Sequence, residues 1–70
     1  MKTSDKKIIF RELKLIREKS DLIIFAMQKD KDFPLLRDLD EVDAIVNSST
    51  LLRNKIKELI ISKPYNHKQQ

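Results

Sequence analysis

Glycine and cysteine are both absent from this 70-residue chain, which contains only two prolines and one histidine. Without glycine, the chain cannot form the glycine-dependent loops that hold phosphate groups, because a Cβ atom would collide where the backbone must approach the phosphate. Without cysteine, it has no disulfide and no thiolate metal site, which favours a reducing compartment. The composition therefore argues against nucleotide chemistry of the usual kinds, and we expect no cofactor.

Long hydrophobic runs are also missing. No apolar run approaches the roughly 18 residues that a membrane-spanning helix needs, and no charged-then-apolar leader begins the chain. The single histidine, His67, lies in a polar tail where nothing positions it as a general base or as part of a zinc site. We therefore expect a cytoplasmic protein without a membrane partner, a small-molecule substrate or a metal, and we favour a binding protein over an enzyme.

The charge is positive overall but unevenly distributed. The formal net charge is +4. Residues 1–33 carry nine basic and six acidic side chains, residues 34–49 one and four, and residues 50–70 five and one. An acidic segment between two basic ones favours self-complementary packing at least as much as a nucleic-acid-binding face.

The first half of the chain predicts one helix over about residues 5–28. Thr3, Ser4 and Asp5 are good N-cap residues, and apolar residues then recur at steps of three and four. Flanking apolar residues widen this stripe to an arc of roughly 200° at about 100° per residue. One partner helix cannot cover such an arc, so we expect either two helices of the same chain to flank it, or one helix and a second protomer.

The second half predicts an all-α domain with either two or three helices. Asp32 is a suitable cap, and Pro34 is tolerated in a first helical turn, so a second helix is expected over about residues 34–46. A third helix is expected over about residues 49–62. The polar segment 64–70 is expected to be a disordered tail of the single domain 1–70.

The stretch NSST, residues 47–50, decides between these two architectures. Four consecutive residues whose side chains compete with the helical backbone cost about 2 kcal/mol together relative to alanine, which favours a break and a small three-helix bundle. Against a break, the spacing of three and four continues from Val42 to Leu59 without glycine or proline. A continuous second helix would instead give a two-helix hairpin. We favour the break.

The most suitable function is that of a small regulatory or adaptor protein that binds another protein or associates with itself, for example as a homodimer. Helix-face recognition would use apolar anchors on the first helix and an acidic edge on the second. The predicted protein-binding residues are Ile16, Ile23, Phe25, Asp40, Glu41 and Asp43. Asp38 falls on the inner side of its helix, where we expect Arg11, Lys14 or Arg17 to pair with it.

A DNA-binding alternative places a helix-turn-helix over residues 39–59, with the turn at Asn47 and a reading helix from Ser49 to Ile60. Polar side chains of that helix would then contact phosphates and base edges. They are Thr50, Arg53, Asn54, Lys55 and Lys57.

Residues 16–47 suggest a third alternative. The run IREKSDLIIFAMQK, a loop, and then LRDLDEVDAIVN resemble the helix-loop-helix of the stage-zero-E-like sporulation aspartyl-phosphate phosphatases, whose second helix carries a Ser-x-Glu-Leu-Asp signature. Glu41 and Asp43 match the acids of that signature, Val42 replaces its leucine, and Leu39 stands in place of its serine. The resemblance implies a helical hairpin that docks on a response regulator, with Asp43 as the residue to test.

Overall fold

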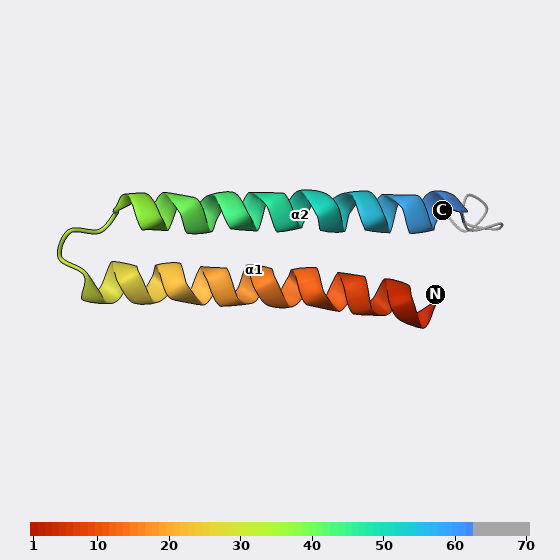
Figure 1. The fold of residues 1–70 in the computed structure, drawn as a ribbon, viewed down its shortest axis with the longest axis horizontal. Helices are drawn as coiled ribbons and strands as arrows, with labels where there is room; N and C mark the ends of the chain where they lie inside the picture. Colours follow the sequence, from red (N-terminus) through yellow and green to blue (C-terminus); the bar gives the residue numbers. More distant parts are fainter. Residues whose placement is uncertain (63–70) are drawn as a thin grey trace.

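The computed structural model describes residues 1–62, which form two antiparallel α-helices joined by a short loop (Figure 1). α1 spans Thr3–Lys29 and α2 spans Leu36–Ser62. The helices lie side by side along their length, so that the start of α1 and the end of α2 meet at one end of the hairpin, called here the open end (Figure 1). The expected all-α class is confirmed, in its two-helix form.

The favoured break at NSST, and with it the three-helix bundle, is wrong. Residues 47–50 lie inside α2, which is continuous from Leu36 to Ser62. Ser48 is 8% exposed and belongs to the side of α2 that packs against α1. Because the inward face continues through this stretch, packing along α1 outweighs the modest helix propensity of these four residues.

The starts of both helices also differ from expectation. α1 begins at Thr3 after Lys2, which makes no side-chain capping hydrogen bond, so the polar residues expected to cap the helix lie within it. α2 begins two residues later than expected, and Asp32 is not its cap. Instead, the backbone N–H of Leu35 donates a 2.7 Å hydrogen bond to the Asp38 carboxylate.

This capping contact also explains why the Asp38 carboxylate is buried without a basic partner. Its side chain is among the most buried polar groups, at 4% exposure, but its hydrogen-bond donor is the backbone N–H of Leu35, the residue just before its own helix, and not a basic residue of α1. The expected pairing with Arg11, Lys14 or Arg17 is therefore wrong. A carboxylate at a helix N-terminus is favoured both by the free backbone N–H groups and by the helix dipole. The end of α2 at Ser62 matches the expectation, whereas the expected tail, 64–70, lies outside the described residues.

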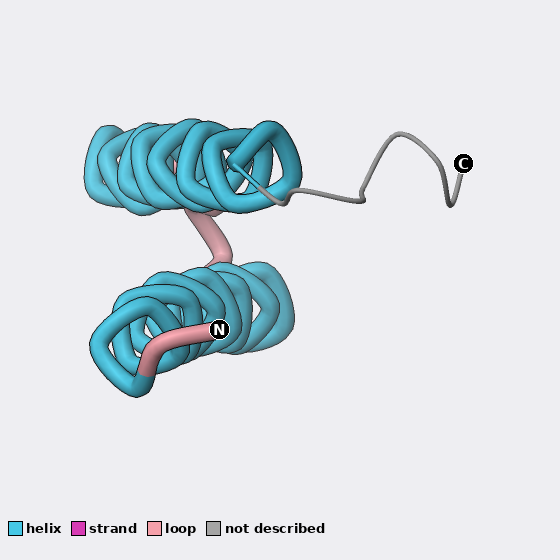
Figure 2. The backbone as a smooth tube through the Cα atoms, turned by 90° about the vertical axis from the view of Figure 1, so that its right-hand side faces the viewer, coloured by secondary structure: helices cyan, strands magenta, loops and turns pink. Residues whose placement is uncertain are grey.

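The interface between the helices, called here the seam, buries little apolar surface. Ala26 is the only buried apolar residue among residues 1–62, and the buried polar residues in this range are Glu12, Asp38 and Ser48. The larger apolar side chains of the seam are only half-buried. Viewed along the hairpin, residues 1–62 form two helices, and neither face of the pair is covered by another element (Figure 2). A 62-residue hairpin with so small a core leaves most of its apolar side chains in contact with solvent.

Candidate protein-binding face

Two ion pairs between α1 and α2 show how the helices align. Lys55 Nζ lies 2.8 Å from Asp5 Oδ1 near the open end, and Lys19 Nζ lies 2.9 Å from Glu41 Oε1 nearer the loop. In each pair the residue numbers sum to 60, and the antiparallel arrangement places other pairs with this sum at matching levels. The numbers of Glu12 and Ser48 also sum to 60, so these two buried residues lie at the same level of the hairpin, midway between the two ion pairs. Polar side chains thus recur every seven residues in the seam.

The ion pair at the open end shifts the ionisation of both partners. The hydrogen bond from Lys55 lowers the pKa of Asp5 below its ordinary value. The hydrogen bonds to Asp5 and then to Glu58 raise the pKa of Lys55. Both groups are therefore held in their charged forms, and the contact favours one alignment of α1 on α2.

One side of the hairpin carries a broad hydrophobic surface, called here the apolar face. Its members are large apolar side chains that are between 39% and 64% exposed. From α1 it includes Phe10, Leu13, Ile24 and Met27, and from the end of the loop and α2 it includes Leu35, Leu39, Val42, Val46, Ile56 and Ile60.

Helical spacing places these residues in one row on each helix. Positions 10, 13, 17, 20, 24 and 27 of α1, like positions 35, 39, 42, 46, 49, 53, 56 and 60 along the loop and α2, follow alternating steps of three and four. The two rows share a side of the molecule. Ile23, which lies one helical turn from positions 20 and 27 of the α1 row, lines a shallow hollow together with Leu39 and Val42 of the α2 row. Arg17, Ser20, Ser49 and Arg53 are the polar members of the rows.

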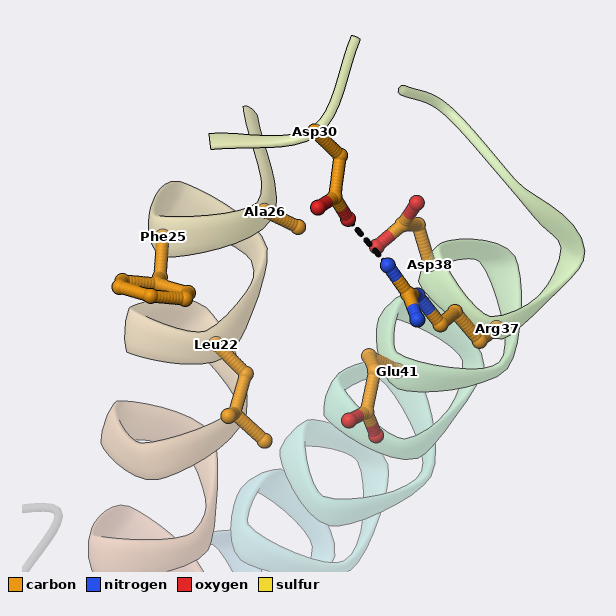
Figure 3. Close-up of a pocket in the computed structure, with 7 residues that line it drawn as sticks. All are labelled: Leu22, Phe25, Ala26, Asp30, Arg37, Asp38 and Glu41. Atoms are coloured by element: carbon orange, nitrogen blue, oxygen red, sulfur yellow. Dashed lines mark hydrogen bonds and ion pairs between the residues drawn. The ribbon is translucent and has the colours of Figure 1, made fainter. Parts of the chain in front are cut away.

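The other side of the hairpin, called here the opposite face, is more polar near the loop. A pocket there is lined by Leu22 and Ala26 of α1 together with Asp38 and Glu41 of α2 (Figure 3). Arg37 forms an ion pair with Asp30 across the top of this pocket (Figure 3). Each charged group that lines the pocket already pairs with another residue or caps α2, so the pocket offers no free charged group.

The six predicted protein-binding residues are spread over several parts of the hairpin. Ile16 and Ile23 are half-buried in the seam, and Ile23 also lines the hollow beside Leu39 and Val42. Phe25 is 61% exposed, and Figure 3 shows its ring on the side of α1 that points away from α2. Glu41 is half-buried and paired with Lys19.

Asp40 and Asp43, the remaining two, are exposed on α2. The apolar row on α2 was not among the predicted residues. Its spacing of three and four is visible in the sequence, but it forms one surface only if the helix is continuous through NSST.

The residues proposed to read DNA have a different arrangement from the one expected. Since α2 contains no turn at Asn47, the predicted helix-turn-helix is wrong for the described residues. Thr50, Arg53, Asn54 and Lys57 are exposed, whereas Lys55 faces the seam and is held by Asp5.

No family model, curated protein or solved structure matches this chain. Within residues 1–62, neither helix has the length and apolar composition that a membrane crossing requires. The same residues contain no group of three acidic or histidine side chains placed to hold a metal ion.

Proposed function

We propose that this protein is a small regulatory or adaptor protein of the cytoplasm that acts by binding another protein through its apolar face. The observation that carries the proposal is the contrast between one buried apolar residue in the seam and ten exposed large apolar side chains on one side of the hairpin. Large contiguous apolar patches are uncommon on soluble monomers and mark interaction sites.

The mechanism is recognition between helix faces. Rows of apolar side chains at steps of three and four fit into the grooves of another helix or helix pair. Arg17 and Arg53 lie within the rows, where their aliphatic stems can pack on the apolar face while their charged ends reach its border. Charges at the border select the partner, because a wrong pairing of like charges is unfavourable.

A matched pair of substitutions tests the apolar face. Val46 is 55% exposed and belongs to the apolar face, whereas Leu51 is 58% exposed on the same helix and lies outside it. The tagged chain carrying either Val46→Glu or Leu51→Glu is recovered from the cells that express it, and co-purifying proteins are quantified by mass spectrometry. We expect Val46→Glu to lose partners that Leu51→Glu retains. Equal retention by both variants, with equal helix content by circular dichroism, would contradict the proposal.

The hairpin also supports a second candidate, docking on a response regulator. It is the architecture that the resemblance to the sporulation phosphatases implies, and Asp43 is exposed on α2, where a partner can reach it. Leu39 at the place of the signature serine weakens the case for hydrolysis of the aspartyl phosphate. In this proposal the protein accelerates loss of phosphate from a phosphorylated response regulator, and Asp43→Ala abolishes the acceleration. If the unsubstituted protein accelerates no candidate regulator, this second proposal is wrong.

A further inference from the structure

We infer that the apolar face binds a second copy of this chain, with the two loops at opposite ends of a four-helix bundle. This inference rests on the proposed function, because it takes the apolar face to be a binding surface and names its occupant. The evidence comes from the distribution of charge along the hairpin and from the size of the face.

The two halves of the hairpin carry opposite net charge. The alignment set by the ion pairs of the seam places Leu15 level with Ile45, and this level divides the described residues into two halves. The open-end half, residues 1–15 and 45–62, has eight basic and three acidic side chains, a net charge of +5. The loop half, residues 16–44, has five basic and eight acidic side chains, a net charge of −3.

This asymmetry selects one arrangement of two stacked hairpins. If both loops lay at the same end, the two positive halves would face each other and so would the two negative halves. If the loops lie at opposite ends, each positive half faces the negative half of the other copy. A two-fold axis across the middle of the apolar face gives this second arrangement and brings each helix antiparallel to its own copy.

The size of the face matches what a stable dimer needs. A 27-residue helix is about 40 Å long, and two adjacent helices are about 20 Å wide, so the face covers about 800 Å². That is the area which each partner contributes to a standard protein–protein interface. The steps of three and four in both rows are also the spacing by which helices of four-helix bundles interlock.

Two measurements on the full chain test the inference. Sedimentation equilibrium or light scattering at micromolar concentrations is expected to give twice the 8.3 kDa of the single chain. Val46→Glu is expected to give the single-chain mass or an unfolded chain, and Leu51→Glu is expected to remain a dimer. A single-chain mass for the unsubstituted protein overturns the inference, as does a dimer that Val46→Glu leaves intact.

The orientation is tested with a spin label at the loop. The chain has no cysteine, so Lys31→Cys provides a unique attachment site at an exposed loop position. With the loops at opposite ends, pulsed electron spin resonance is expected to give a distance between labels of about 40 Å or more, the length of the helices. A distance below about 25 Å, roughly two helix diameters, would place the loops together and overturn the inference.

Failure of the inference can be separated from failure of the proposed function. The protein could be folded and have the single-chain mass, and still capture partners that Val46→Glu loses and Leu51→Glu retains. That result would refute self-association and leave the protein-binding face in place. A single-chain mass together with equal partner recovery by the two variants would refute both.

Discussion

Replacing Asn47 and Thr50 by alanine is expected to stabilise the hairpin. Both side chains are exposed, lie within α2 and fall outside the rows of the apolar face. Within a continuous helix, asparagine and threonine are each about 0.5 kcal/mol less favourable than alanine. The double variant should therefore raise the free energy of unfolding by about 1 kcal/mol.

The sign of this change distinguishes the two architectures. If Asn47 ended one helix and a neighbouring residue capped the next, loss of the polar side chains would lower stability by about 0.5–2 kcal/mol per cap. Asn47→Gly provides a second comparison. Within a helix it should be less stable than Asn47→Ala by about 1 kcal/mol, whereas at a left-handed helix end glycine would be the preferred residue.

Urea unfolding followed by circular dichroism at 222 nm measures this change. At a slope of about 1 kcal/mol per molar urea, typical of the smallest proteins, the midpoint of the double variant should rise by about 1 M. All variants must be compared at one protein concentration, because association makes the midpoint depend on concentration. A lower midpoint for the double variant, with Asn47→Gly at or above Asn47→Ala, would refute a continuous α2.

Three further predictions concern the capping and pairing of the helices. Asp38→Ala should lower the free energy of unfolding by about 1 kcal/mol, because the N–H of Leu35 loses its acceptor; urea unfolding would show this, and Asp38→Asn, which keeps an oxygen acceptor, should lose less. The pKa of Asp5 is lowered in the folded protein from 3.8. Its contribution to the free energy of unfolding is therefore present above pH 3.8 and is lost as the pH falls below that value. The unsubstituted protein should therefore melt at a higher temperature than Asp5→Asn near pH 6, and the difference should shrink progressively as the pH falls below 3.8. Since the pKa of Lys55 is raised from 10.5, its contribution to the free energy of unfolding is present below pH 10.5 and is lost as the pH rises further. The melting temperature of Lys55→Met should therefore approach that of the unsubstituted protein above that pH. A difference between Asp5→Asn and the unsubstituted protein that does not change with pH would contradict the role given to this ion pair.

Much of the fold could be predicted because the local spacing of apolar residues determines where the helices form. The steps of three and four predicted α1 to within two residues at each end, and the end of α2 at Ser62 was also predicted. The helix starts could not be predicted in the same way, because several polar residues near each start can cap a helix and the sequence does not show which one is used. Asp38 was recognised as an inward-facing acid, but its partner, the backbone N–H of the residue just before its own helix, was not.

The candidate site could be predicted only in part. An apolar arc too wide for one partner helix was visible in the sequence, and the exposed side chains of α1 agree with it. The contribution of α2 to the apolar face was missed, because NSST was taken as a break and a break would have divided the row between two helices. Phe25 stands out in the sequence as an aromatic residue on a polar side of the helix, but it lies away from α2 and outside the apolar face (Figure 3).

By itself, the sequence determined that the chain is helical, that glycine-dependent phosphate loops are excluded, and that apolar side chains outnumber the places where two helices can bury them. Composition and local spacing are enough for these conclusions. Only the tertiary structure decided that α2 continues through residues 47–50, how the two helices align, and which rows form one surface. These features depend on packing and on ion pairs between residues far apart in the chain, such as Asp5 and Lys55, and local propensity contains no information about such contacts.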